Sequence, residues 1–154
     1  MDDLVTWLRA QLDEDERIAR EAVRYADATW RLDSVDNVAV SSVLTAAGEQ
    51  EAPITADRWR RPMVESAGVV AHVAAHDPAR VLREVDAKRQ WLEALIGESH
   101  ATLRPGGSTE IYCGADYGTS ESCECGRDDR VSQYLRLLAL PYADRPGYRE
   151  EWRP

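Results

Sequence analysis

The sequence predicts an α+β fold that is mainly α, in which about four helices pack with a small antiparallel β-meander. Three observations support this prediction. Apolar residues recur every three or four positions near both ends of the chain and in its middle, which is typical of amphipathic helices. Around residues 37–45, β-branched residues alternate instead. A loop-rich segment that contains all three cysteines precedes the last helix.

The first predicted helix covers residues 3–27. Its apolar positions follow the helical repeat, and we expect the charged run from Asp13 to Arg17 to face solvent. Trp7 and Tyr25 are expected to lie beside the apolar stripe. The residues expected to form the stripe are Leu4, Leu8, Leu12, Ile18, Ala22 and Ala26.

A meander of two or three strands is predicted from Trp30 onward. The β-branched alternation around Asn37 to Thr45 predicts strand, and the residues Ala47 to Glu49 predict a turn. Because so small a sheet is marginally stable alone, we expect it to lie against the helices. The tryptophans Trp30 and Trp59 are the expected packing contacts.

Two predicted helices meet at Asp77. Its carboxylate can accept hydrogen bonds from the free N–H groups of a first helical turn, and Pro78 suits the first helical position. We therefore predict a helix over 78–96, ended by Gly97. Because the residue before a proline avoids helical dihedral angles, a separate helix is predicted over 63–75.

His72 and His76 lie four residues apart and would share one helical face. Two imidazoles at this spacing can grip one metal ion. The metalloprotease form of the spacing needs a glutamate beside the first histidine, and Val73 stands there instead. We therefore favour a structural role, in which one histidine interacts with the negative end of its own helix and the other packs against a neighbour.

The last predicted helix covers residues 129–140, with Asp128 or Asp129 as its N-cap. Four leucines between positions 135 and 140 leave it little polar face, so we expect it to be central in the core. Pro141 is expected to end it. An aromatic, turn-rich tail follows. The tail residues expected to fold back onto the domain are Tyr142, Tyr148 and Trp152.

Cys113, Cys123 and Cys125 lie in the loop-rich segment 98–128, which also holds a short predicted strand at 110–114. Glycine follows the first and third cysteine, as in zinc knuckles, where that position often needs a left-handed backbone. The spacing C-x9-C-x-C lacks paired C-x-x-C motifs, so a zinc site would need a fourth ligand from elsewhere. Unligated thiols are the alternative. The candidates for the fourth ligand are His100, His76, His72 and Asp116.

The composition predicts a single domain over residues 1–154. Hydrophobic residues make up 44% of the chain and charged residues 31%, which are ordinary values for a globular protein. The start of the chain is acidic and interrupted, unlike a signal peptide, and no apolar run approaches the length of a membrane span. We therefore expect a cytoplasmic protein with no membrane association.

Three segments of the sequence are distinctive: MDDLVTWLRAQLDEDE, HDPARVLREVDAKR and LRLLALPYADRPGYREEWRP. On these segments the chain resembles a family of small proteins of unknown function from streptomycetes, related actinobacteria and their phages. The resemblance spans both ends and the middle of the chain. It implies source and domain boundaries, and it brings no catalytic residues.

The formal net charge of −9 argues against direct binding of nucleic acid. Neutralising phosphates needs a clustered basic face, and only Arg58, Arg60 and Arg61 come near to one. Negative charge could instead attract a basic partner or imitate DNA.

The leading functional hypothesis is a small accessory protein, phage-linked or from the host, that acts by binding another protein. No G-x-S-x-G turn, phosphate-binding loop or paired general acid and base supports an enzyme. The alternatives are an acidic DNA mimic and a structural-zinc module, and a metal-dependent enzyme is less favoured. Zinc is the one cofactor that the sequence indicates. The apolar final helix would also suit a homodimer interface.

Overall fold

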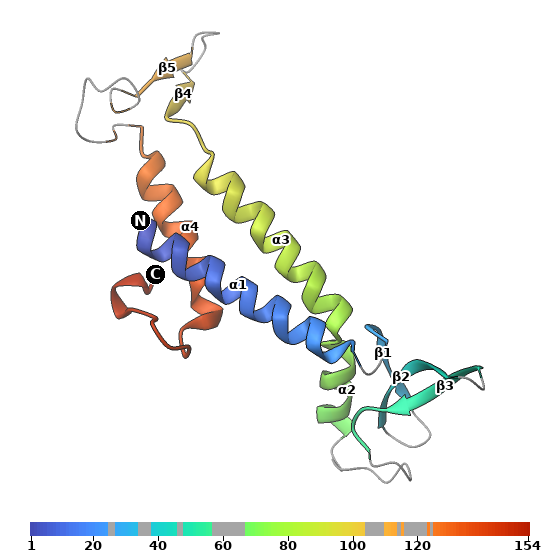
Figure 1. Ribbon diagram of the computed structural model, residues 1–154. Helices are drawn as coiled ribbons and strands as arrows, with labels where there is room; N and C mark the ends of the chain where they lie inside the picture. Colours follow the sequence, from blue (N-terminus) through green and yellow to red (C-terminus); the bar gives the residue numbers. More distant parts are fainter. Residues whose placement is uncertain are drawn as a thin grey trace. The chain divides into compact units, whose positions relative to one another are not determined.

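The protein has a mainly helical α+β fold, as predicted (Figure 1). It is seen here in a computed structural model. Within the described residues no helix has both the length and the apolarity needed to cross a membrane. The residues described are 1–24, 27–33, 38–45, 48–56, 67–103, 110–113, 115, 123 and 125–154.

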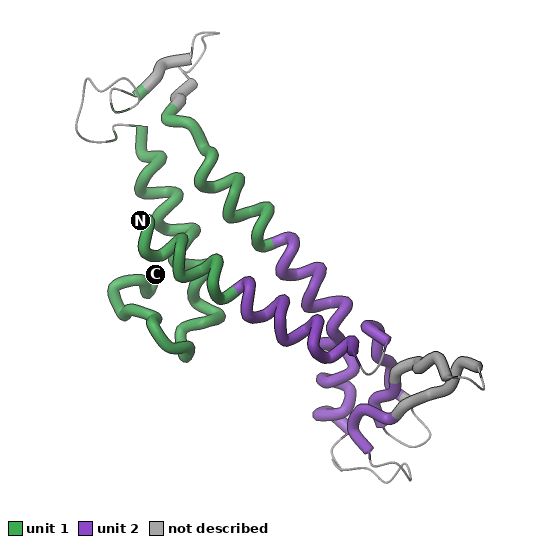
Figure 2. The backbone as a smooth tube through the Cα atoms, viewed as in Figure 1, with its two compact units in different colours: residues 1–11, 88–154 green, residues 12–87 purple. Residues whose placement is uncertain are grey.

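Contacts divide the chain into two compact units (Figure 2). Unit 1 comprises residues 1–11 and 88–154, and unit 2 comprises residues 12–87. The helices α1 (Asp2–Ala22) and α3 (Pro78–Ile96) each contribute residues to both units. The single domain expected from composition stays a prediction.

Unit 2 contains the predicted meander as three antiparallel strands in the order β1-β2-β3. In the register, Trp30 lies opposite Ser41 and Thr45 lies opposite Gly48. The predicted turn overlaps the start of the third strand, because that strand already begins at Gly48. The strands are β1 (Trp30–Asp33), β2 (Val38–Thr45) and β3 (Gly48–Pro53).

The meander packs against α2 (Ala67–Ala75), as a marginal sheet requires. Buried Ala39 of β2 clusters with Val70 and Ala74 of the helix. The N–H of Ala39 donates to the hydroxyl of buried Thr55 (2.9 Å), which satisfies a main-chain donor inside the core.

Two of the sequence predictions for unit 2 reach beyond the described residues. Helix α2 begins at Ala67, and residues 57–66, which include both the predicted start at 63 and Trp59, lie outside the described part. Trp30 is half-buried, and its indole N–H donates to the carbonyl of Asp27 (3.2 Å). The packing role expected of Trp30 and Trp59 stays a prediction.

Asp77 caps α3 as predicted, and it is 8% exposed. One carboxylate oxygen accepts a hydrogen bond from the Arg80 N–H (2.6 Å), three residues into the helix. The other accepts from the N–H of Trp30 (3.3 Å). The same side chain therefore starts α3 and fixes the first strand of the meander.

The apolar stripe of α1 is predicted correctly at its start and wrongly further along. Leu4, Leu8 and Leu12 are buried, but Ile18 is 51% exposed and Ala19 is buried in its place. Ala19 continues the helical repeat from Leu12, whereas position 18 turns away from the core. The helix ends at Ala22, earlier than the predicted 27.

In unit 1, the leucines predicted to make helix α4 (Arg127–Ala139) wholly buried are only partly buried. Leu135 and Leu138 are buried, but Leu137 is 44% exposed and Leu140 is 42% exposed. Helical geometry separates these positions onto two faces, so the prediction of a wholly central helix is wrong. A short 3-10 helix, Leu140–Tyr142, contains Pro141 and follows directly.

The aromatic tail folds back onto α1, as predicted. The Trp7 ring lies 5.7 Å from the Tyr148 ring and 5.3 Å from the Trp152 ring, measured between centroids. Its indole N–H donates to the carbonyl of Pro146 (3.1 Å). Gly147 has a φ of +84°, and a Cβ there would meet Trp7 at 3.0 Å, so this close approach requires glycine.

Candidate metal centre

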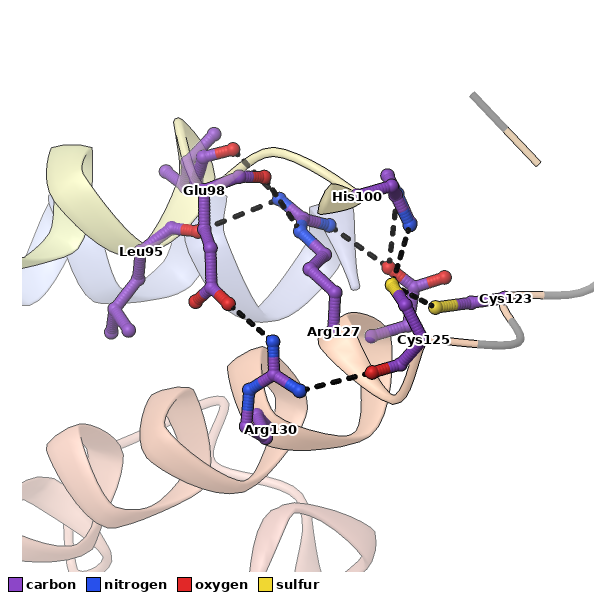
Figure 3. Close-up of polar contacts among 9 residues, drawn as sticks. Leu95, Glu98, His100, Cys123, Cys125, Arg127 and Arg130 are labelled. Carbon is purple, nitrogen blue, oxygen red and sulfur yellow. Dashed lines mark hydrogen bonds and ion pairs between the residues drawn. The ribbon is translucent and has the colours of Figure 1, made fainter. Parts of the chain in front are cut away.

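Four potential ligands converge between α3 and α4 of unit 1. The ligand atoms of His100, Cys113, Cys123 and Cys125 all lie within 4.8 Å of one another. The Sγ atoms of Cys123 and Cys125 are 3.4 Å apart, and Cys125 Sγ is 3.8 Å from His100 Nδ1 (Figure 3). Within the described part of the chain, this is the one group of its kind.

A short β-hairpin brings His100 and Cys113 together. Strands β4 (Ala101–Leu103) and β5 (Glu110–Tyr112) are antiparallel, with Ala101 opposite Tyr112. The N–H of Cys113 donates to the carbonyl of His100 (2.8 Å), which extends the pairing by one position. The strand predicted at 110–114 is present over Glu110–Tyr112, Gly114 lies outside the described residues, and the partner strand β4 was not predicted.

The N-terminus of α4 holds the other two cysteines. Gly126 stands at the N-cap with a φ of +74°, which confirms the left-handed conformation expected after Cys125. The backbone N–H of Asp128 donates to the sulfur of Cys123, and that of Arg127 donates to the sulfur of Cys125. Free N–H groups of the first helical turn therefore bind the two sulfurs.

The predicted N-cap of α4 is accordingly wrong. The helix begins at Arg127, two residues before the predicted start, and no side chain caps it. Asp128 and Asp129 lie inside the first turn. Because sulfurs accept first-turn N–H groups, a capping carboxylate is not needed at this end.

The surroundings shift the pKa values of the two neighbouring thiols in opposite directions. The hydrogen bond from the Asp128 N–H, helped by Cys125 and His100, lowers the pKa of Cys123 to about 6. Burial raises the pKa of the Cys125 thiol. The hydrogen bond with Cys123 raises the pKa of His100. The environment thus favours a thiolate, the form that binds metals, at Cys123.

Asp128 and Arg127, in the first turn of α4, lie beside the cluster. His100 Nε2 lies 3.5 Å from Asp128 Oδ1, which also accepts a hydrogen bond from the Arg127 guanidinium (2.9 Å). Figure 3 shows the guanidinium between the end of α3 and the start of α4. The side chain of Arg127 is 13% exposed, so this ion pair is largely shielded from water on the arginine side.

Arg127 also binds the free carbonyls at the C-terminal end of α3. Its Nη2 donates to the carbonyl of Ile96 (2.8 Å) and its Nε donates to that of Glu98 (2.9 Å). A guanidinium at this place satisfies orphan carbonyls and complements the negative end of the helix. Arg130 adds an ion pair with the Glu98 carboxylate (2.6 Å).

Gly97 follows the last residue of α3, where the sequence predicts the end of the helix. Its φ is not in the left-handed range that a glycine C-cap uses. The helix therefore ends at the predicted residue. Its last carbonyls are satisfied by Arg127 and not by a glycine cap.

The donor set fits a zinc ion. Zinc prefers thiolate and imidazole ligands at about 2.3 and 2.0 Å in a tetrahedron, which places two sulfurs about 3.8 Å apart and a sulfur and a nitrogen about 3.5 Å apart. The distances of 3.4 Å between Cys123 Sγ and Cys125 Sγ and 3.8 Å between Cys125 Sγ and His100 Nδ1 lie within about 0.4 Å of these values. Three sulfurs and one nitrogen complete a tetrahedron without a water ligand, which is the composition of a structural site.

Of the five predicted metal ligands, the structure brings together all but His76. That histidine belongs to unit 2, where its Nδ1 contacts the carbonyl of His72 (2.8 Å) and the two rings stack with centroids 4.0 Å apart. A histidine at the C-terminal end of its own helix is the structural role favoured from the sequence. Asp116 lies outside the described residues.

Sequence reasoning missed Arg127 and Asp128 as parts of the site. Asp128 stands three residues after Cys125, in an acidic first helical turn. This position is as typical of a helix N-cap as of a residue that contacts a metal ligand. The signal that distinguishes the two roles is the glycine after Cys125, which can occupy the N-cap position itself.

Comparison with known proteins identifies a family but no activity. No curated protein and no solved structure shows significant similarity to the chain. The match to a family described only as a family of unknown function covers residues 1–154. The chain therefore belongs to the family of unknown function DUF6221.

Proposed function

We propose that this protein is a structural-zinc module, in which one Zn²⁺ ion bound by His100, Cys113, Cys123 and Cys125 joins the β4–β5 hairpin to the start of α4. The observation that carries the proposal is the convergence of these four ligand atoms within 4.8 Å. Apolar packing gives no reason for three cysteines and a histidine from three separate segments to meet, whereas one shared zinc ion does.

The proposed role is structural and not catalytic. A catalytic zinc keeps one position for water or substrate, whereas four protein donors fill the tetrahedron. The segment between α3 and α4 contributes Cys113 as the only buried residue among those whose burial is described between 98 and 126. An ion would therefore give this segment the stability that apolar contacts would otherwise supply.

Metal analysis of the intact protein tests this proposal. Protein purified without added metal should contain about one zinc per chain, and cobalt substitution should give the charge-transfer absorption of a thiolate-bound tetrahedral ion. The variant His100→Ala should lose the metal. The matched control His76→Ala, which changes a histidine outside the cluster, should retain it. Zinc near zero in the wild-type protein, or equal loss in both variants, would overturn the proposal.

A second candidate function, protein binding, is favoured by an exposed apolar surface of unit 1. Trp91 is 50% exposed and its ring centroid lies 6.4 Å from that of Tyr134, which is 40% exposed. Large apolar side chains are rarely left together in water on a monomer. We call this group the α3–α4 surface. Its members are Trp91, Tyr134, Leu137 and Leu140.

The occupant we propose for the α3–α4 surface is a second copy of the chain. No carboxylate stands one helical turn from Trp91 or Tyr134 in a chain of net charge −9: the exposed positions there include Ala87, Ala94 and Arg130. A basic partner would seek the carboxylates elsewhere on the chain, whereas an isologous dimer places this acid-free surface against itself.

Sedimentation of the zinc-loaded protein tests this second candidate. Association should strengthen with added salt, because screening weakens the repulsion between two chains of the same net charge. Leu137→Glu should abolish it, and the control Ile18→Glu, at an exposed apolar residue of unit 2, should leave it unchanged. A wild-type protein that stays monomeric at its highest soluble concentration would refute the dimer.

The other functional expectations stay predictions. Many carboxylates of the described residues are already paired with arginine, as in Glu14 with Arg17 and Glu150 with Arg153, which does not favour a DNA mimic. The phage or actinobacterial origin, the cytoplasmic location and a heterologous partner stay predictions. A metal-dependent enzyme would need an open coordination position, and four protein donors argue against one.

A further inference from the structure

We infer that Asp128 is the outer-sphere residue of the zinc site: it orients His100 so that Nδ1 faces the metal, and through Arg127 it links metal binding to the C-terminal end of α3. The inference rests on the proposed zinc site and adds a residue that the ligand set does not contain. Its basis is a continuous series of contacts among described side chains.

The two ring nitrogens of His100 face different partners. Nδ1 lies 3.8 Å from Cys125 Sγ, inside the cluster, whereas Nε2 lies 3.5 Å from Asp128 Oδ1. A histidine that binds a metal through one nitrogen carries its proton on the other. With Nδ1 on the metal, the Nε2–H therefore points at a carboxylate, which is the arrangement that fixes a metal-binding imidazole in many zinc proteins.

Asp128 can orient the ring because it is itself held in place. Arg127 donates to the same Oδ1 at 2.9 Å. The remaining donors of that guanidinium bind the carbonyls of Ile96 (2.8 Å) and Glu98 (2.9 Å). A planar guanidinium that binds a carboxylate and two main-chain carbonyls has little freedom to rotate. The imidazole of His100 thus contacts a carboxylate that Arg127 links to the C-terminal end of α3.

The backbone of Asp128 contributes as well as its side chain. Its N–H donates to the Cys123 sulfur, which is a second predicted ligand. One residue therefore contacts two of the four ligands, one through its carboxylate and one through its main chain. A substitution of the side chain removes its contacts to His100 and Arg127 but leaves the main-chain contact to Cys123, so the effect of the carboxylate can be measured separately.

Zinc competition measurements on the full-length protein test the inference. Loss of an outer-sphere carboxylate lowers metal affinity by about 10- to 100-fold, so Asp128→Ala should weaken zinc binding by this factor. Asp128→Asn keeps an acceptor oxygen without the charge and should give an intermediate loss. The matched control is Asp129→Ala, which removes an equal charge from the same helical turn and should leave the affinity within about twofold of wild type.

A spectroscopic readout separates orientation from general stability. In the zinc-loaded wild type, ¹⁵N NMR should show His100 with metal on Nδ1 and a slowly exchanging proton on Nε2. In Asp128→Ala the Nε2 proton should exchange rapidly, even where excess zinc restores full occupancy. The Asp128→Asn variant keeps this measurement meaningful if the alanine variant does not fold.

The inference and the proposed zinc site fail in different ways. A wild-type protein that binds no zinc overturns the site itself. A wild type that binds zinc, together with equal affinities in the Asp128 and Asp129 variants, overturns only the role of Asp128. Metal found on Nε2 would overturn it as well.

Discussion

The two ends of helix α3 are secured by different means. At its start, Asp77 accepts a hydrogen bond from the N–H of Arg80, three residues away. At its end, the carbonyls of Ile96 and Glu98 accept hydrogen bonds from Arg127, which lies 31 residues beyond Ile96 in the sequence. The start is therefore a local property of the sequence, whereas the end depends on how the segment between α3 and α4 folds.

A bound metal ion would therefore affect the C-terminal end of α3 more than its start. The guanidinium that caps α3 also binds Asp128, which contacts a predicted zinc ligand, so the C-terminal end of the helix is connected to the candidate metal centre. In the part of the chain that the structure describes, the contacts of Asp77 are with Arg80 and Trp30 and do not reach the cysteines. Perturbing the cluster should therefore act on one end of the same helix and spare the other.

Metal removal should have the largest effect. A ligand present at a thousand times its dissociation constant stabilises the folded state by about 4 kcal/mol, and chelation removes this contribution. In hydrogen exchange, the amides of residues 93–97 should lose protection, whereas those of residues 80–84 should lose much less. An equal loss at both ends would contradict the proposed connection.

Replacement of Arg127 with alanine should be next in size. A single hydrogen bond contributes about 0.5–1.5 kcal/mol and one to a charged group more, so loss of its contacts to carbonyls and to Asp128 should lower the free energy of unfolding by about 2–4 kcal/mol. Arg127→Lys should recover little of this, because an ammonium cannot reproduce the planar fork. Denaturant unfolding of both variants measures the difference, and full recovery by lysine would contradict the geometry.

Replacement of Asp77 with alanine should lower the free energy of unfolding by about 0.5–2 kcal/mol, which is the usual loss for an N-cap. Asp77→Asn should lose less, since the amide oxygen can still accept from the Arg80 N–H. Zinc affinity should be unchanged in both. A change in metal affinity on replacing Asp77 would show that the two ends of α3 are coupled.

Replacement of Gly97 with alanine should have the smallest effect, below about 1 kcal/mol. Its φ is not left-handed, and the nearest atom to an added Cβ is the carbonyl oxygen of Glu93 at 3.2 Å. Gly126→Ala serves as the contrast: at a φ of +74° it should lower stability by about 1–2 kcal/mol. Thermal unfolding compares the two, and a larger loss at Gly97 would mean that glycine, and not Arg127, ends the helix.

The sequence predicts the fold well where the signals are local. Asp77 and Pro78 stand side by side, and the predicted bounds of α3 agree with the structure at both ends. The faces of the helices are less predictable, because neither the leucines of α4 nor Ile18 of α1 show from the sequence which elements will cover them. Leu137 and Leu140 are exposed because burial depends on the tertiary neighbours.

The candidate site is predictable in its cysteines and not in its fourth ligand. The glycine after Cys125 and the clustering of the thiols indicate a metal site, but four residues compete as its last member. What selects His100 is the pairing of β4 with β5, which places Cys113 opposite it. β4 has only three residues, Ala101 to Leu103, too few for a periodic pattern to identify a strand.

The acceptors that Arg127 uses in α3 have a consequence for how the sequence can change over time. Main-chain carbonyls are present whatever side chains stand at positions 96 and 98, so these positions are free to mutate without losing the contact. A comparison of homologous sequences should therefore show a constant arginine whose contacts have no covarying partner in α3. Methods that infer contacts from correlated substitutions would miss this link between the two helices.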